Sequence, residues 1–218
     1  MFVDLSFRII GNEIPADHAY ALYSSLSRLQ PALHQAAWLA VHPINGTPSK
    51  VGTLKLTRSS RLRFRLPIDS VPALIPLAGK RLPLVGGPSI SMIHIGVPEV
   101  NTLRPSATLH SRCVTIKVSE VENKEIEVDR DMFLKATRKR LAECGINGTV
   151  EIEQSLDERG RERSRRVVRI KNRIVVGYAV TVKDLSDEDS LMLQEKGLGG
   201  RRRMGCGIFV PCTERKVK

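Results

Sequence analysis

The sequence has 218 residues, 41% of them hydrophobic, and carries 35 Lys and Arg against 23 Asp and Glu, a formal net charge of +12. No apolar run approaches the roughly 18 residues that cross a bilayer, so we expect a soluble globular chain with either one large domain or two compact ones. Lys and Arg exceed Asp and Glu by 11 to 5 in residues 1–110 and by 24 to 18 in residues 111–218, so the excess is not confined to a basic tail and indicates a polyanionic partner.

A strand and a helix are expected first. Residues 2–10 alternate apolar and polar side chains, which is typical of a strand. The following segment, IPADHAYALYSSLSRLQPALH, has apolar residues at helical spacing, namely Ala19, Leu22, Tyr23, Leu26 and Leu33. Pro15 with Asp17 indicates a helix start, and Pro31 should break the helix. His34 therefore lies at a helix end or in a loop.

Three short strands are expected next, in AAWLAVHPI, KVGTLKLT and RLRFRLP. The last alternates two faces, one apolar and one basic: Leu62, Phe64 and Leu66 against Arg61, Arg63 and Arg65. Such a basic face is suited to contact with RNA. Residues 68–77 read as weakly helical, and LPLVGGPSISMIHIGVPEV closes this half as a strand broken by Gly86, Gly87 and Pro88.

The second half repeats this order of elements. It contains the strand SRCVTIKVSE, the helix DRDMFLKATRKRLAECG ending at Gly145, the strands GTVEIEQ and VVRIKNRIVVGYAVTVKD, the helix SDEDSLMLQEKG and the strand CGIFVP. Each half thus reads β-α-β-β-α-β, the split β-α-β pattern. We expect an α+β protein of two tandem ferredoxin-like (RRM-like) domains, 1–103 and 104–218, with the boundary among the Pro and polar residues 101–106.

A glycine-rich and arginine-rich segment, GLGGRRRMGCGIFVP, is the strongest local motif. Glycines let a backbone approach a phosphate closely, and guanidinium groups add bidentate contacts. The segment lies between a helix and a strand, so it is neither a dinucleotide fingerprint nor a Walker loop. We expect it to bind RNA through Gly197, Gly199, Gly200, Arg201, Arg202, Arg203, Gly205 and Gly207.

A second basic segment, DERGRERSRRVVRIKNR, lies in an expected β-hairpin. A charge run is often only a solvated surface, but arginine-rich segments also fit the groove of a hairpin RNA. The expected RNA contacts are Arg161, Arg163, Arg165, Arg166 and Arg169. Aromatic residues make up only 4% of the chain, so stacking of bases on aromatic rings is not expected to dominate binding.

The histidines are the candidates for proton transfer, because imidazole changes charge near neutral pH. Cleavage of RNA without a metal requires a base for the 2′-hydroxyl, an acid for the 5′-oxygen and a cation for the charged phosphorane. His18 at the start of the first helix and His34 just past its end are the leading candidates, and His42 comes third. His94, in the apolar run SMIHIGV, reads as a satisfied core or strand histidine, and nothing favours His110.

The four cysteines form no C-x-x-C pair and have no matching histidine spacing, which argues against a zinc site. The segment MFVDLSFRII lacks the features of a signal peptide. We expect reduced thiols, a cytoplasmic location, and neither a metal nor another cofactor.

These segments resemble the CRISPR repeat-processing endoribonucleases, Cas family six. GLGGRRRMGCGIFVP resembles the glycine-rich loop of that family, IPADHAYALYSSLSRLQPALHQ its first helix and catalytic segment, and VHPINGTP the variant found with certain type I systems. The resemblance implies two ferredoxin-like domains and metal-independent cleavage of precursor CRISPR RNA within repeats, leaving a 5′-hydroxyl and a 2′,3′-cyclic phosphate. Many members stay on the product as a Cascade subunit, so other Cascade subunits are further expected partners.

The resemblance also implies a catalytic histidine within or just after the first helix. PALHQ matches one branch of the family through Leu33 and His34, although Gln35 stands where an acid is common. Inside the helix this chain offers Tyr20, Tyr23 and Ser27 instead. His34 is therefore the first expected catalytic residue and His18 the second, with Lys50 or Lys55 as the stabilising cation. The alternative is a non-catalytic subunit that binds repeat RNA and whose histidines are structural.

Overall fold

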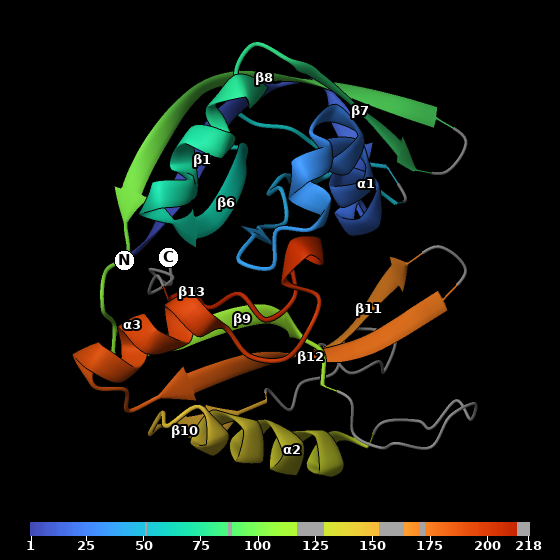
Figure 1. Ribbon diagram of the computed structural model, residues 1–218. Coiled ribbons are helices and arrows are strands. Elements are labelled where there is room, and N and C mark those ends of the chain that lie inside the picture. The colour runs from blue at the N-terminus through green and yellow to red at the C-terminus, as the bar shows by residue number, and fades with distance from the viewer. Residues whose placement is uncertain (51, 87–88, 117–128, 153–163, 171–172, 213–218) are drawn as a thin grey trace, which may run out of the picture. The chain divides into compact units, whose positions relative to one another are not determined.

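Figure 1 shows the computed structural model, which describes residues 1–50, 52–86, 89–116, 129–152, 164–170 and 173–212. The chain forms two compact units. The first unit comprises Met1–Leu103, Arg169–Arg173 and Arg203–Gly205, and the second comprises Arg104–Val168, Ile174–Arg202 and Cys206–Lys218. The domain limits 1–103 and 104–218 stay a prediction, since the first unit also includes two short segments of the second half.

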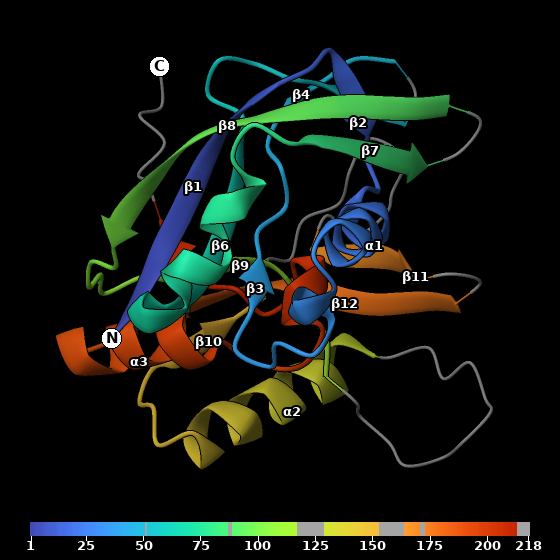
Figure 2. The same ribbon diagram turned by 45° about the horizontal axis from the view of Figure 1, so that its top comes forward.

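The first unit is built on a five-stranded antiparallel sheet in the order β3-β6-β1-β8-β7. Figure 2 shows β1 (Phe2–Ile10) between β6 (Arg61–Pro67) and β8 (Ser89–Thr102). β3 (Ala40–Val41) and β7 (Arg81–Gly86) form the two edges. A smaller sheet holds three further short strands: β2 (Glu13–Pro15), β4 (Thr47–Pro48) and β5 (Thr53–Lys55).

Helix α1 (Ala19–Leu29) follows the first strand as expected, but it starts later than Pro15 and Asp17. His18 is its N-cap residue, without a side-chain capping hydrogen bond. Pro31 does end the helix: Gln30 leaves the helical conformation, and a separate 3₁₀ helix, η1, spans Pro31–His34. A proline lacks the N–H that the helix would need and clashes with the preceding turn.

The second helix expected in the first half is absent as an α-helix from the described residues 68–77. Two 3₁₀ helices occupy this stretch, η2 (Ile68–Ala73) and η3 (Ile75–Leu77). Pro72 lies inside the first of them and Pro76 inside the second, so neither position can donate the backbone hydrogen bond that an α-helix requires. The strand order is still that of a split β-α-β fold.

The second unit has a five-stranded sheet, in which four strands follow the order β10-β12-β9-β13 and the fifth, β11, pairs with β12. The strands are β9 (Leu109–Val114), β10 (Thr149–Glu151), β11 (Arg165–Ile170), β12 (Arg173–Lys183) and β13 (Val210–Pro211). The helices are α2 (Arg130–Glu143) and α3 (Asp187–Lys196), followed by the 3₁₀ helix η4 (Arg202–Met204). The α+β fold with two ferredoxin-like halves is confirmed.

Local signals fix the ends of these two helices. The Asp129 carboxylate accepts a hydrogen bond from the backbone N–H of Met132 at 3.3 Å, and Ser186 accepts one from Asp189 at 3.1 Å. Gly145 follows α2 with a φ of +73°, as the sequence predicts for a residue that ends a helix.

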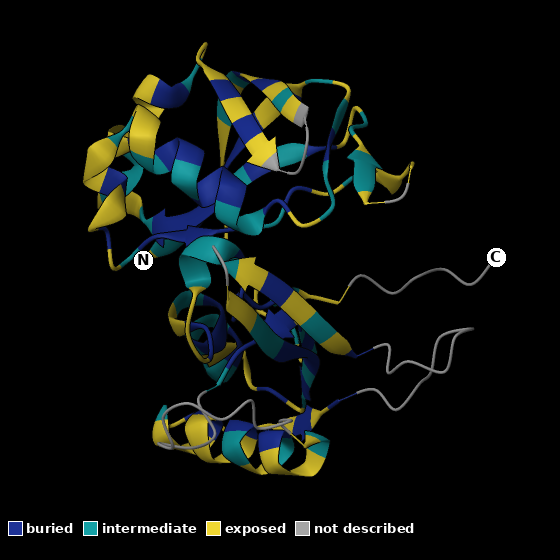
Figure 3. Ribbon diagram, turned by 90° about the vertical axis from the view of Figure 1, so that its right-hand side faces the viewer, coloured by how far each residue is buried: buried dark blue, intermediate teal, exposed yellow. Residues whose placement is uncertain are grey.

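Each unit has its own apolar core, and Figure 3 shows buried and exposed positions alternating along strands and helices. In the first unit Phe7 and Phe64 pack edge to face, with ring centroids 5.9 Å apart. In the second, Phe133 of α2 packs on Tyr178 of β12 at 4.9 Å. Among the residues that the structure describes, no helix has the length and apolar character needed to cross a membrane.

Candidate functional site

Three side chains of the first unit meet around one phenol oxygen. The Tyr23 hydroxyl lies 3.3 Å from Nδ1 of His34 and donates a hydrogen bond to the His34 carbonyl oxygen at 3.2 Å. Nη1 of Arg203 donates to the same hydroxyl oxygen at 3.1 Å and also to the His34 carbonyl oxygen. The Arg203 guanidinium carbon lies 5.4 Å from the centre of the Tyr23 ring. Tyr23, His34 and Arg203 therefore form one connected cluster.

The hydrogen bonds favour one tautomer of His34. The Tyr23 hydroxyl donates its proton in a hydrogen bond to the His34 carbonyl oxygen, and Arg203 donates to the hydroxyl oxygen. All three contacts are satisfied together when Nδ1 of His34 carries the ring proton and also donates to the phenol oxygen. Nε2 then carries a lone pair, and it has no hydrogen-bond partner within the described part of the chain. This arrangement suits a general base.

The local sequence explains why His34 is exposed although Leu33 and Tyr23 beside it are buried. Leu33 is 1% exposed and anchors η1 in the core, whereas His34, the next residue, projects to the surface. Tyr23 lies on the buried side of α1, and its ring stacks on the imidazole with centroids 6.0 Å apart and planes 19° apart. The break at Pro31 turns the chain back so that the two rings meet.

His18 has a different environment. It is 2% exposed, its Nδ1 lies 2.8 Å from the Pro15 carbonyl oxygen, and its Nε2 accepts a hydrogen bond from the backbone N–H of Ile44 at 3.0 Å. Both ring nitrogens are thus engaged by backbone groups. This geometry is that of a neutral structural histidine, which ties the start of α1 to the loop after β3, and a catalytic role for His18 stays an untested prediction.

His42 belongs to a buried polar group on the strands. The Asp4 carboxylate accepts two hydrogen bonds from Arg65, at 2.8 and 3.0 Å, and lies 3.5 Å from Nε2 of His42. Burial alone would raise the pKa of Asp4, but the nearby His42 and the hydrogen-bonded Arg65 guanidinium outweigh it and hold that pKa well below its usual range. Burial lowers the pKa of His42, against the pull of Asp4.

The expected basic face of β6 is only partly open. Arg65 is 1% exposed and its guanidinium is committed to Asp4, so it is not available to RNA. Arg61 and Arg63 remain half-buried on that face. Of the other histidines, His94 lies in the strand β8, as expected, but is exposed and not part of the core, and Nδ1 of His110 lies 3.2 Å from the Thr181 hydroxyl.

The glycine-rich segment folds against its own backbone. Gly197, Gly199 and Gly207 have positive φ angles, and a Cβ atom at each would collide with a carbonyl oxygen of Gly207, Thr115 and Leu198, respectively. Leu198 and Gly207 are joined by a backbone hydrogen bond of 3.1 Å. These glycines are required by close approach of the chain to itself, and their expected contact with phosphate stays a prediction.

The three consecutive arginines of this segment have three different environments. Arg201 is exposed, with a φ of +62° that is unusual for a residue with a side chain. Nη2 of Arg202 donates to the Glu195 carbonyl oxygen at 2.7 Å, near the C-terminal end of α3. Arg203 joins the cluster of Tyr23 and His34. The two remaining glycines differ as well, since Gly205 packs on Pro43 while Gly200 has open space around it.

The second basic segment is described in part. Arg161 and Arg163 lie outside the described residues. Along β11, Arg165 and Arg169 are exposed and Arg166 is half-buried, so Arg165 and Arg169 share the exposed face of the strand.

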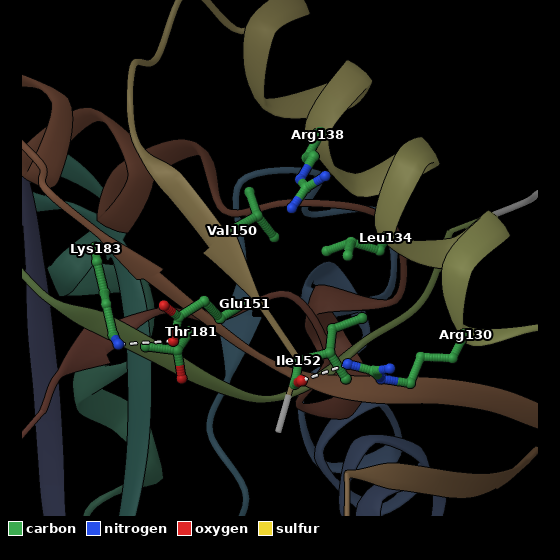
Figure 4. Close-up of a pocket in the computed structure, with 8 residues that line it drawn as sticks. All are labelled: Arg130, Leu134, Arg138, Val150, Glu151, Ile152, Thr181 and Lys183. Carbon is green, nitrogen blue, oxygen red and sulfur yellow. Dashed lines mark hydrogen bonds and ion pairs between the residues drawn. The ribbon is translucent and has the colours of Figure 1, made fainter. Parts of the chain in front are cut away.

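A hollow of about 570 Å³ lies in the second unit, between α2 and the edge strand β10. Figure 4 shows its lining residues: Arg130, Leu134, Arg138, Val150, Glu151, Ile152, Thr181 and Lys183. The Lys183 ammonium pairs with Glu151 at 2.7 Å, and Nη2 of Arg130 donates to the Ile152 carbonyl oxygen at 3.0 Å. Within the described ranges, no group of three or more His, Cys, Asp or Glu side chains is arranged to hold a metal ion.

Comparison with known proteins gives the family. The sequence model of Cas6, described as Cas6 Crispr, matches residues 3–214. The chain is also 37% identical over 211 residues to the CRISPR-associated endonuclease Cas6 of Myxococcus xanthus (strain DK1622), covering 97% of this chain and 82% of the relative. The chain belongs to the Cas6 family. The expected resemblance is thus confirmed.

Solved Cas6 structures share the fold. A CRISPR associated protein Cas6 superposes with a TM-score of 0.70 at 14% identity, covering 98% of this chain and 100% of the other. A Cas6-related protein from Pyrococcus furiosus gives 0.64 at 14% identity, covering 99% and 100%. The CRISPR endoribonuclease Cse3, solved with a 19-nucleotide RNA, gives 0.52 at 13% identity, covering 97% and 100%.

The sequence alone did not indicate that Tyr23 and Arg203 would contact His34. Tyr23 was noted only as a residue that the helix offers, and Arg203 only as one of three loop arginines. Lys50 and Lys55, expected as the stabilising cation, have no hydrogen bond or ion pair with His34 in the described structure; the cation in contact with it is Arg203. Arg203 is 169 positions from His34, and no spacing rule could have paired them.

Proposed function

We propose that this Cas6 family member is an endoribonuclease that cuts precursor CRISPR RNA within its repeats. The observation that carries the proposal is the cluster of Tyr23, His34 and Arg203, in which the Tyr23 phenol contacts the imidazole of the exposed His34 and the Arg203 guanidinium binds both that phenol and the His34 carbonyl oxygen. The family membership and the 37% identical endonuclease from Myxococcus xanthus support it.

In the proposed reaction, Nε2 of His34 accepts the proton of the 2′-hydroxyl, and the resulting oxygen attacks the adjacent phosphorus. The bond from phosphorus to the 5′-oxygen breaks, and that oxygen takes a proton from solvent or from the imidazolium. The products carry a 2′,3′-cyclic phosphate and a 5′-hydroxyl. No step uses a metal ion.

Arg203 and Tyr23 have separate roles in this scheme. The Arg203 guanidinium, bound to the Tyr23 hydroxyl and the His34 carbonyl oxygen, is the cation that stabilises the extra negative charge of the phosphorane. Tyr23 is the positioning residue, since its hydroxyl contacts both Nδ1 and the carbonyl oxygen of His34 and so fixes the ring and its tautomer.

Binding of the RNA is assigned to the two basic segments of the second half. We propose that Arg165, Arg166 and Arg169 of β11, Arg161 and Arg163 before it, and Arg201 of the glycine-rich segment contact RNA phosphates. Gly197, Gly199, Gly205 and Gly207 keep the glycine-rich segment in the conformation that presents Arg201, and Gly200, which has open space around it, lets the backbone approach a phosphate. We further propose that the product stays bound within a Cascade complex and that the protein acts in the cytoplasm.

The proposal is tested by incubating the wild-type protein with end-labelled repeat RNA in excess EDTA. A single cut, with a product that gains a terminal monophosphate only after acid opening of the cyclic ester, is the expected result. Tight binding without any cut would instead support the non-catalytic repeat-RNA-binding subunit.

A further inference from the structure

A polar hollow of about 310 Å³ lies on the outer face of the first unit's sheet. It is lined by residues of three neighbouring strands: Asp4 and Ser6 of β1, Arg61 and Arg63 of β6, and Glu99 and Asn101 of β8. Residues two apart on a strand share a face, and the intervening residues Val3, Leu5, Leu62 and Phe64 fill the core on the other side. The hollow therefore lies on the face of the sheet opposite to the core.

Strand register places one complementary pair of charges across this hollow. Ser6 pairs with Arg63 on one side and with Glu99 on the other, so the three residues form a single row across β6, β1 and β8. Neighbouring strands are about 4.8 Å apart, which puts the backbones of Arg63 and Glu99 about 10 Å from each other. Ser6, a small side chain, forms the floor between them.

In the next row across the strands, the charge of Asp4 is already paired with a charge of the protein itself. Asp4 lies between Arg65 and Asn101, and its carboxylate is bound to the buried Arg65 guanidinium. Nη1 of Arg61 donates to the carbonyl oxygens of Arg58 and Ser60, so the groups left to meet a ligand are mainly Glu99, Asn101 and the outer end of Arg63. Within the described residues, the side chains of Glu99 and Asn101 have no hydrogen bond or ion pair, and the hydrogen bond of the Arg63 side chain runs from Nε to Ser6 Oγ at 3.2 Å.

This set of groups has the chemistry of a nucleobase site. An Arg guanidinium donates two parallel hydrogen bonds to adjacent acceptors, and an ionised carboxylate accepts two from adjacent N–H groups. Guanine presents both patterns, with acceptors O6 and N7 on one edge and donors N1–H and N2–H on the next. The other bases of RNA lack the adjacent pair of donors. The carboxylate of Glu99 also disfavours a phosphate inside the hollow.

We propose that the hollow between Arg63, Ser6 and Glu99 binds a guanine base of single-stranded RNA. Glu99 accepts hydrogen bonds from N1–H and N2–H, Arg63 donates to O6 and N7, and Asn101 contacts the ribose or the neighbouring base. That the guanine belongs to an RNA and not to a free nucleotide rests on the proposed function. The site gives the enzyme a base preference that its phosphate contacts cannot supply.

Binding of short RNAs tests this proposal without any cleavage. The pentaribonucleotides UUGUU, UUIUU and UUAUU, where I is inosine and lacks the N2 amino group, are titrated by fluorescence anisotropy. The wild-type protein is expected to bind the guanine pentamer at least about tenfold more tightly than the other two. Glu99→Gln should abolish this preference, and Asp69→Asn, which removes one exposed carboxylate elsewhere in the same unit, should keep it.

Equal affinities for the three pentamers, or a preference that survives Glu99→Gln, would overturn the proposal. Competition with free GMP distinguishes a site for guanine in RNA from a site for free guanine nucleotides. No displacement of UUGUU at a tenfold excess of GMP supports a site for RNA, and displacement at equal concentrations assigns the site to free nucleotides instead. If repeat RNA is cut but guanine is not preferred, this inference alone fails; if guanine is preferred but repeat RNA is never cut, the proposed function fails.

Discussion

Nη1 of Arg203 lies 3.1 Å from the hydroxyl oxygen of Tyr23, 180 positions earlier in the chain, and so connects the glycine-rich segment to the first helix. Because Tyr23 in turn contacts His34, a loop expected only to hold RNA also supplies a cation to the candidate catalytic histidine. The account of the active site depends on this cluster, and the variants below test its members.

Removing only the hydroxyl of Tyr23 should slow cleavage while leaving RNA binding intact. Tyr23→Phe keeps the ring that stacks on His34 but loses the contacts to Nδ1 and to the carbonyl oxygen. We expect the single-turnover rate to fall by about tenfold, as for loss of a hydrogen bond that orients a catalytic base. The measurement is the rate at saturating protein across pH 5.5–8.5.

A purely structural role for the Tyr23 hydroxyl would lower the melting temperature without changing the shape of the pH profile. A positioning role should change the pH profile, because the hydroxyl fixes the tautomer of His34. Tyr20→Phe is the matched control on the same helix and should behave as the wild type.

Arg203 should be required for its shape as well as for its charge. A single nitrogen, Nη1, donates to both the Tyr23 hydroxyl and the His34 carbonyl oxygen, while the guanidinium carbon lies 5.4 Å from the centre of the Tyr23 ring, a planar stacking contact that an ammonium group does not reproduce. We expect Arg203→Ala to reduce the single-turnover rate by about 100-fold and Arg203→Lys to restore only part of it. Full activity of Arg203→Ala at saturating protein would show that the cation acts elsewhere.

Gly207 should be essential for folding of the glycine-rich segment, in contrast to Gly200. Gly207 has a φ of +65°, and a Cβ atom there would collide with the Leu198 carbonyl oxygen, whereas a Cβ atom at Gly200 meets nothing within 4 Å. We expect Gly207→Ala to lower the free energy of unfolding by about 2 kcal/mol or more and Gly200→Ala to change it by less than about 1 kcal/mol. Urea denaturation of the two variants gives the comparison, and equal stabilities would contradict the packing role.

The sequence predicts most of this fold because the signals are local. Alternation marks β1 and β6, Pro31 ends α1, and Gly145 ends α2 as expected. The expected helix in residues 68–77 is replaced by 3₁₀ turns, since Pro72 and Pro76 outweigh the apolar spacing around them.

The candidate site is less accessible to sequence reasoning. His34 can be proposed from its place after Pro31, but its partners depend on tertiary contacts between distant segments. For Arg65 the prediction is wrong in another way. Alternation places it correctly on the outer face of β6, yet its side chain is buried and ion-paired with Asp4, so it cannot contact RNA. Periodicity gives the face of a strand and does not reveal which charges on that face are already neutralised.

The most direct measurement is the single-turnover cleavage of repeat RNA by His34→Ala, with His94→Ala as the matched exposed histidine. Loss of a general base costs about 10²- to 10⁴-fold in rate, so the account predicts a drop of that size with RNA affinity preserved in His34→Ala and normal cleavage in His94→Ala. Cleavage by His34→Ala at the wild-type rate would contradict the assignment of His34 and, with it, the proposed active site.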